Sequence, residues 1–348
     1  MKVVMTLLVR DEEDIIDSMI AFHLNAGVDF VIAMDNESVD STTDILESYA
    51  RDGYLHLIRE EELDHFEQGR WVSRMARLAA TDFRADWVIN ADADEFWWPR
   101  GGSLKEVFGT IPSRFGRVYA MVRHFVPRPE VEDFFADRMT VRVCNPGSEK
   151  NNPFGPRSLI AHRAHPEISL NDGRHEPAGT LRPLIGWYPI DVLHFPIRSL
   201  QQCEQKYRIR WEALVRGGLP PPSVYGVAYD AYREGRFEQF YETFLVDDRA
   251  LEHRLADGTL ALDTRLRDAL RSVRAAAPRG LLHFDVSGAA GAVRFDDPTV
   301  DEAYLAELGR LSEIEPVART RKRVEQLEAR LAALERSLPA RIRRAVGA

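Results

Sequence analysis

Trp-Val-Ile-Asn-Ala-Asp-Ala-Asp-Glu-Phe, residues 87–96, is the stretch with the strongest fold signal in this sequence. Residues 86–91 are mostly apolar, which is typical of a strand buried on both faces in the middle of a parallel sheet. Asp92 and Asp94 follow directly where this strand would end. Ligands of open α/β sheets bind at the carboxyl ends of the strands, where helix N-termini also converge. The stretch therefore predicts an α/β fold with an acidic site at one edge of its sheet.

The sequence before this stretch alternates short β-rich runs with longer helical runs. Gly27 stands where a left-handed residue would end the first helix, and Asp40 to Asp44 supply candidates for the N-cap and acidic first turn of the second. Beyond Pro99, frequent Pro, Gly and Asn residues between 127 and 191 predict loops and short antiparallel strands. We expect strands at 3–9, 28–34, 54–58 and 86–91, and helices at 14–25, 42–50, 69–80, 199–216 and 228–245.

Composition and charge favour a globular protein that does not bind nucleic acid. The chain has 348 residues, 45% of them hydrophobic and 29% charged, as is typical of a globular protein with room for one large α/β domain. Residues 319–348 hold nine Arg or Lys and three Glu, a balance of +6, so the remainder carries −15 of the total of −9. Such a remainder repels nucleic acid, so we expect no nucleic-acid partner.

The sequence shows no sign of a membrane span or of a disulfide framework. No apolar run reaches the roughly 20 residues that a membrane-spanning helix requires. The two cysteines, Cys144 and Cys203, lie far apart and lack the spacing of a structural zinc site. We therefore expect a cytoplasmic protein, with any membrane contact at the inner face and peripheral.

Two groups of acidic residues are candidates for ligand binding. Asp92 and Asp94, at i and i+2 just past a buried strand, can chelate one hard cation such as Mg²⁺ or Mn²⁺. The alternative is a solvated acidic loop or a helix cap. Asp35 also follows a predicted strand and can accept a hydrogen bond from an N–H of a nucleobase, while the alternative there is a simple strand-turn-helix connection.

Three motifs give the sequence a resemblance to a known family. Residues 6–13, 34–42 and 91–96 occur in the order and spacing seen in family 2-like glycosyltransferases of the GT-A fold. The motifs resemble those of the bacterial branch with a D-x-D-E-F metal motif, and the match covers roughly the first hundred residues. Arg10 and Asp11 depart from the Lys-Asn pair that is common in the first loop. The resemblance implies a Rossmann-like mixed sheet flanked by helices and a nucleotide-diphosphate sugar as donor, with UDP as the first choice and GDP or dTDP as alternatives.

The same resemblance implies roles for individual residues. Asp35 would bind the nucleobase, and Asp92 and Asp94 would bind the ribose and the metal ion. Further nucleotide contacts are expected at Leu8, Val9, Arg10, Glu12, Asn36 and Ala93. Arg74, one helical turn after Arg70, is a candidate for the pyrophosphate, although arginines at such positions more often solvate a surface.

Residues 191–206 form a second informative segment. Related transferases have a similar sequence here, so His194 resembles a third metal ligand, and Arg198 and Lys206 resemble partners of the diphosphate. A neutral imidazole is a suitable metal ligand, and nearby cations stabilise a leaving group that gains negative charge. The alternative for His194 is a structural role in the core.

Sugar transfer with inversion, which the resemblance implies, needs a general base for the acceptor hydroxyl. The polar stretch 171–177 supplies the candidates Glu176, Asp172 and His175, although it also fits a simple turn. Glu95, beside the metal pair, is a candidate for orienting the acceptor or a water molecule.

We expect three segments: residues 1–200 as the GT-A catalytic domain, 201–312 as its helical completion, and 313–348 as a basic tail. Apolar residues between 317 and 338 recur at the a and d positions of a short coiled coil, so the tail could form a homo-oligomer or bind anionic lipid. The acceptor would be a saccharide or a lipid-linked hydroxyl. The alternatives are an inactive GT-A scaffold that assembles through the coiled coil, and a nucleotidyltransferase, whose glycine-rich first loop this sequence lacks.

Overall fold

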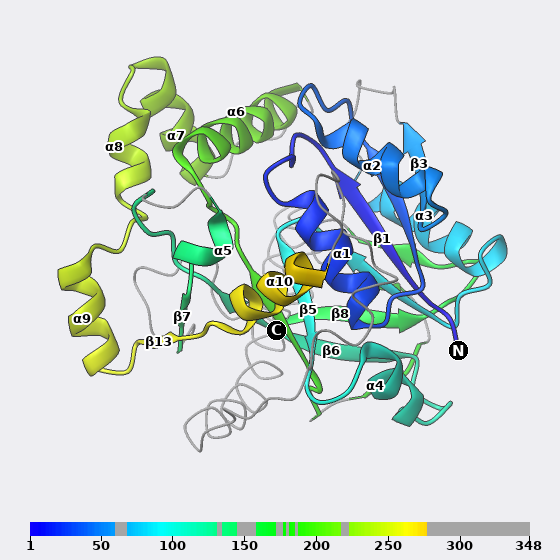
Figure 1. Ribbon diagram of the computed structural model, residues 1–348. Coiled ribbons are helices and arrows are strands. Elements are labelled where there is room, and N and C mark those ends of the chain that lie inside the picture. The colour runs from blue at the N-terminus through cyan, green and yellow to red at the C-terminus, as the bar shows by residue number, and fades with distance from the viewer. Residues whose placement is uncertain are drawn as a thin grey trace, which may run out of the picture. The chain divides into compact units, whose positions relative to one another are not determined.

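Figure 1 shows the computed structural model of the chain. The structure describes residues 1–59, 68–130, 134–144, 158–171, 177–178, 181–184, 187–216 and 223–276. The expected tail, residues 313–348, and its coiled coil at 317–338 therefore lie outside the described residues.

Nine strands of the described chain form one mixed sheet in the order β3-β2-β1-β4-β8-β6-β12-β5, with β11 paired to β6. These strands are β1 (Val3–Val9), β2 (Phe30–Asp35), β3 (Leu55–Arg59), β4 (Trp87–Ala91), β5 (Glu95–Pro99), β6 (Arg117–His124), β8 (Ser158–Arg163), β11 (Pro183–Leu184) and β12 (Ile190–His194). The first four are parallel to one another, and β8 continues the sheet antiparallel to β4. Two small ladders pair β9 (Ser169–Leu170) with β10 (Pro177–Ala178) and β7 (Val141–Val143) with β13 (Leu260–Leu262).

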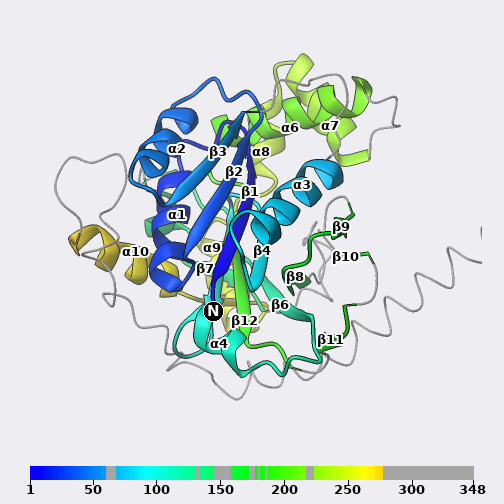
Figure 2. The same cartoon turned by 90° about the vertical axis from the view of Figure 1, so that its right-hand side faces the viewer.

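Helices cover both faces of the parallel part of the sheet, as Figure 2 shows. α1 (Ile16–Ala26) and α2 (Thr42–Arg51) pack on one face and α3 (Gln68–Thr81) on the other. The alternating side chains of β1 explain this arrangement, since Val3, Met5 and Leu7 join the core under α1 and α2, whereas Val4 joins the core under α3. The remaining helices are α4 (Leu104–Thr110), α5 (Phe135–Arg138), α6 (Leu200–Arg216), α7 (Ser223–Arg233), α8 (Phe237–Glu242), α9 (Asp248–Ala256) and α10 (Arg265–Ala276).

β4 and β5 are joined by a three-residue turn, yet they are not neighbours in the sheet. β5 instead pairs antiparallel with β12 at the far end of the strand order. α1 packs against β5 there. In this contact His23 Nε2, on α1, accepts a hydrogen bond from the Trp97 N–H at 2.9 Å. The chain thus leaves the parallel part of the sheet at residues 92–94, the acidic motif.

The predicted α/β fold, with a mixed sheet flanked by helices, is confirmed. Each predicted element up to residue 91 is present, with bounds that differ by only a few residues. Gly27 has a φ of 109°, the left-handed value that was expected at the end of the first helix. The single helix expected at 228–245 is wrong, since Gly235, with a φ of 68°, separates α7 from α8.

The three expected segments stay a prediction. None of the described helices is both long and apolar enough to span a bilayer.

Candidate functional site

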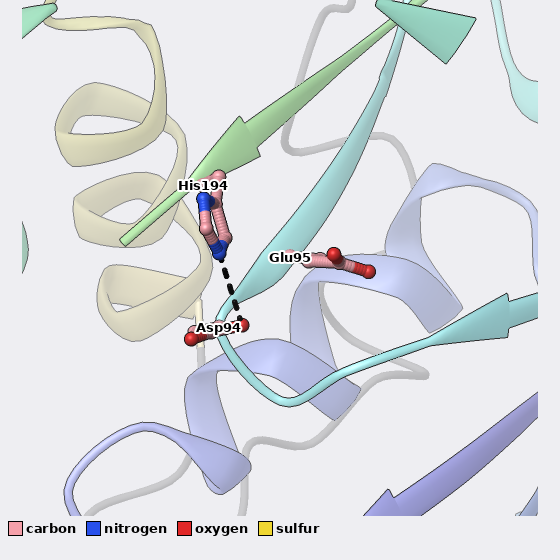
Figure 3. A group of neighbouring side chains, drawn as sticks. All are labelled: Asp94, Glu95 and His194. Atoms are coloured by element: carbon pink, nitrogen blue, oxygen red, sulfur yellow. Dashed lines mark ion pairs between the residues drawn. The ribbon is translucent and has the colours of Figure 1, made fainter. Parts of the chain in front are cut away.

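Asp94, Glu95 and His194 form a buried cluster near the carboxyl end of β4 (Figure 3). Asp94 is the last residue of the turn after β4, and Glu95 is the first residue of β5. The Glu95 N–H donates to the Asp92 carbonyl at 3.2 Å and closes the turn. His194 ends β12 and lies opposite Glu95 in the antiparallel register. One ligand atom from each of the three residues lies within 4.8 Å of the other two. Side chains that are one hundred residues apart in sequence are therefore brought together by strand pairing.

The two oxygens of the Asp94 carboxylate have different partners. Oδ2 accepts a hydrogen bond from Lys206 Nζ at 2.6 Å, whereas Oδ1 lies 3.6 Å from His194 Nε2. Burial of Asp94 would raise its pKa, but Lys206, His194 and Arg198 outweigh this and hold the pKa well below its usual range. Asp94 is therefore ionised at neutral pH, and its Oδ1 faces the imidazole.

Asp92 and Ala93 complete the turn, but Asp92 does not belong to the three-residue cluster. The Asp92 N–H donates to Glu95 Oε2 at 3.1 Å, so one oxygen of Glu95 holds the turn. The D-x-D pair of the sequence is thus represented in the described cluster by Asp94, and the acidic ligand next to it is Glu95.

Arg198 lies in the core of an ion cluster rather than on an open surface. Its side chain is 0% exposed, and its Nε donates to Asp14 Oδ2 at 2.6 Å. Its Nη2 donates to Asp14 Oδ1 at 2.8 Å and also pairs with Glu12, while Nη1 donates to the Phe195 carbonyl at 3.1 Å. Most donors of this guanidinium are therefore used within the protein, and they join the loop after β1 to the segment after β12.

Glu12, Asp14 and Asp94 face two cations, Arg198 and Lys206, so these five groups carry one excess negative charge. This excess charge acts on the pKa of Glu12. Burial and the neighbouring Asp94 and Asp14 outweigh the two cations and raise the pKa of Glu12 to about 7. Burial would lower the pKa of Lys206, but Asp94 and Glu12 outweigh it and raise that pKa, so the lysine is charged.

Side-chain hydrogen bonds join the loop after β1 to the segment after β2. The Asp11 N–H donates to Ser38 Oγ at 3.0 Å, and the Glu12 N–H donates to Thr42 Oγ1 at 2.8 Å. Asp35 is 5% exposed, and its carboxylate accepts from the Ser38 N–H, from Ser38 Oγ at 2.7 Å and from Thr43 Oγ1 at 2.5 Å. Asp35 thus stabilises the strand-turn-helix connection at the N-terminus of α2.

Other predicted residues lie at different places around the same sheet edge. Val9 and Asn36 are buried at the ends of β1 and β2, and the Asn36 N–H donates to the Val9 carbonyl at 2.9 Å. Leu8 and Arg10 are half-buried, whereas Arg74 is exposed on α3. The candidates for the base, Asp172, His175 and Glu176, lie outside the described residues.

Two residues near the cluster were missed in the sequence. Asp14 belongs to the acidic run 11–14, and its distance of two residues from Glu12 was a signal that both could bind one cation. His124 ends β6, and its Nδ1 lies 2.9 Å from Nδ1 of His194. Strand register alone brings these two histidines together, so no local pattern could have revealed His124.

The ligand atoms suit a hard divalent cation. Two carboxylates and one imidazole match the ligands that Mg²⁺ and Mn²⁺ accept, and the rest of an octahedral shell would come from water or from substrate oxygens. The position at the carboxyl end of β4 is also where ligands of α/β sheets bind.

Comparison with known proteins gives a family match for part of the chain. Residues 5–113 match the family model described as glycosyltransferase family 92. This segment is just under a third of the chain, and it contains both loops and the acidic turn. The resemblance to glycosyltransferases is confirmed over these residues, whereas the assignment to the family 2-like group stays a prediction. No curated protein matches the sequence.

Solved structures give remote likenesses. S. aureus TarS 1–349 is 13% identical over 60% of this chain and 65% of that chain, less than two thirds of its length, with a TM-score of 0.36. Glucosyl-3-phosphoglycerate synthase from Mycobacterium tuberculosis, in complex with Mn²⁺, UDP and glucosyl-3-phosphoglycerate, is 21% identical over 35% of this chain and 44% of that chain, with a TM-score of 0.26. These TM-scores are below 0.5, so the two structures add no argument about the activity of this chain.

Proposed function

We propose that this chain transfers a sugar from a nucleoside diphosphate donor to a hydroxyl acceptor with the help of a divalent cation. The observation that carries the proposal is the buried cluster of Asp94, Glu95 and His194 at the carboxyl end of β4. The family match supports it, because the matched residues include Asp94 and Glu95. The donor base is proposed to be uracil first, with guanine and thymine as alternatives.

A cation bound to Asp94, Glu95 and His194 would neutralise the negative charge that the diphosphate gains as it leaves. The chain itself supplies a second positive charge beside this position. Lys206 Nζ donates to Asp94 Oδ2, and the lysine side chain is 39% exposed, so part of this side chain reaches solvent beside the cluster. We assign Lys206 to the stabilisation of the leaving diphosphate.

Arg198 receives a different role from the one that the resemblance implied. Because Glu12 and Asp14 occupy its guanidinium, we propose that it holds the first loop against the segment that carries His194 and Lys206. It would thus fix the geometry of the site without contacting the diphosphate.

Transfer with inversion needs a base on the acceptor side. Glu176, with Asp172 and His175 as alternatives, stays the proposed source. Self-association through residues 317–338 and contact with anionic lipid also stay predictions.

The proposal is tested by the release of nucleoside diphosphate from a panel of UDP-, GDP- and dTDP-sugars in the presence of Mn²⁺. Asp94→Asn keeps the size of the side chain and removes its charge, so we expect a rate loss of roughly 100-fold or more, or about 3 kcal/mol of transition-state stabilisation. Asp44→Asn, at an exposed position in α2, is the matched control and should keep the wild-type rate. A wild-type rate in Asp94→Asn would remove the metal site, and a wild-type protein that releases no nucleotide from any donor would contradict the transferase.

A further inference from the structure

Three titratable side chains lie in one row across neighbouring strands. In the strand order β6-β12-β5, His124 is paired with His194, and His194 is paired with Glu95. Residues that are paired across a sheet project from the same face. His194 thus has two neighbours in this row, Glu95 on β5 and His124 on β6.

The contact between the two histidines is a hydrogen bond between like atoms. Nδ1 of His124 lies 2.9 Å from Nδ1 of His194, and the rings meet edge to face with centroids 5.0 Å apart. Both side chains are buried, at 3% and 4% exposure. A hydrogen bond between two imidazole nitrogens contains one proton, so one Nδ1 donates and the other accepts.

The position of that proton determines which atom His194 can offer to a cation. A neutral imidazole carries its proton on one nitrogen and a lone pair on the other. If His194 donates from Nδ1, its Nε2 has a lone pair directed toward Asp94 Oδ1, 3.6 Å away. If His124 donates instead, the proton of His194 is on Nε2, and that nitrogen cannot bind a cation.

We infer that His124 is a positioning residue that accepts the Nδ1 proton of His194 and thereby directs the Nε2 lone pair of His194 toward the metal position. The inference rests on the proposed function, because the metal position is part of that proposal. Partners of a metal-binding histidine fix its tautomer and ring orientation, and their loss typically lowers metal affinity about 10- to 100-fold. In this chain the partner is a second histidine on the adjacent strand, where carboxylates and backbone carbonyls are the usual partners.

Lys206 has the corresponding role for Asp94. It holds Oδ2, so that Oδ1 is the oxygen that faces His194. The two ligand atoms are thus each oriented from behind by a residue that does not itself bind the cation.

The tautomer is measured directly by ¹⁵N NMR of protein labelled at histidine and saturated with Mg²⁺. We expect His194 to carry its proton on Nδ1, and to be identified by the loss of its signals in a His194→Asn variant. A His194 protonated on Nε2 would overturn the inference. The cation is needed because, without it, the ionised Asp94 Oδ1 at 3.6 Å favours a proton on Nε2 of His194. Histidine signals that do not change when Mg²⁺ is added would contradict the metal site rather than the role of His124.

The consequence for binding is measured by calorimetric titration of Mn²⁺ into wild type and two variants. His124→Asn places an acceptor oxygen near the position of Nδ1 and should keep the affinity for Mn²⁺ within about threefold, whereas His124→Leu removes the acceptor and should lower it about 10- to 100-fold. His162→Leu, at an equally buried histidine of β8 outside the cluster, is the control for loss of a core histidine.

The outcomes separate the two proposals. Equal Mn²⁺ affinity in wild type and His124→Leu would overturn the role of His124 while leaving the metal site in place. A wild-type protein that binds no Mn²⁺ would contradict the metal site itself. An equal loss in His124→Leu and His162→Leu would show a general effect of core packing and would also overturn the inference.

Discussion

At the scale of single residues, the site is a balance of buried charges. Asp94 is kept ionised by the cations around it, and Lys206 is kept charged mainly by Asp94 and Glu12. A divalent cation beside Asp94 would compensate the excess negative charge that Glu12 carries at high pH. In the proposed site, the positive charge of the cation and the negative charge of the diphosphate would therefore compensate each other.

Lys206→Met removes one positive charge and keeps an unbranched side chain that is one heavy atom shorter. We expect the affinity for Mn²⁺ alone to stay equal or rise, because a competing cation is lost, and the affinity for UDP with Mn²⁺ to fall roughly tenfold. Both are measured by calorimetry. Lys105→Met, at a lysine paired with Asp29 on the surface, is the control. A lower Mn²⁺ affinity with unchanged UDP affinity would contradict the role given to Lys206.

The sequence predicted some of these residues and not others for a physical reason. Asp94 was found because a buried strand directly precedes it, and His194 because a longer segment around it resembles related transferases. The contact of Arg198 with Glu12 and Asp14 spans more than 180 residues, so no local pattern contains it. The resemblance accordingly suggested a diphosphate partner, where the structure shows an internal ion cluster.

At the scale of elements, the site depends on the joining of two chain segments. The loop before α1 supplies Glu12 and Asp14, and the segment between β12 and α6 supplies Arg198. Sequence periodicity predicted β1 to β4 and the three helices between them, because each is a local pattern of apolar residues. It could not predict that β5 pairs with β12 at the far end of the strand order, since strand pairing depends on the whole chain.

Arg198→Met tests the joining role. Removing one partner of a buried ion cluster leaves carboxylates without compensation, so we expect the free energy of unfolding to fall by about 3 to 5 kcal/mol. Urea unfolding at pH 7.5 measures this loss. Arg208→Met, at a partly exposed i,i+4 pair on α6, should change the stability by less than about 1 kcal/mol. Wild-type stability combined with lost UDP binding would instead make Arg198 the diphosphate partner that the resemblance implied.

At the scale of the whole molecule, two buried neutral histidines couple folding to pH. Burial lowers the pKa of His23 to about 3 and that of His162 to about 4, although each also donates to a backbone carbonyl. The unfolded chain binds protons at these positions below its pKa of 6.5, and the folded chain does not, so stability falls as the pH drops below that value. The raised pKa of Glu12 acts in the opposite direction, since it stabilises the fold as the pH drops through about 7.

Because these effects oppose each other, a comparison of variants is needed to see either one. His23→Gln keeps an acceptor for the Trp97 N–H but does not titrate. We expect wild type to lose about 2 kcal/mol more unfolding free energy than this variant between pH 7.5 and pH 5. Urea unfolding at both pH values measures the difference. An equal loss in the two proteins would show that His23 is protonated in the folded state or is neutral in both states.

We propose that Asp94, Glu95 and His194 bind a cation that carries a nucleoside diphosphate. Calorimetric titration of UDP, GDP and dTDP into the intact chain, first with Mn²⁺ and then with excess chelator, measures this binding. We expect one nucleotide to bind with Mn²⁺ and chelator to abolish this binding. Binding that is equally tight with chelator, or no binding of any of the three nucleotides with Mn²⁺, would contradict it.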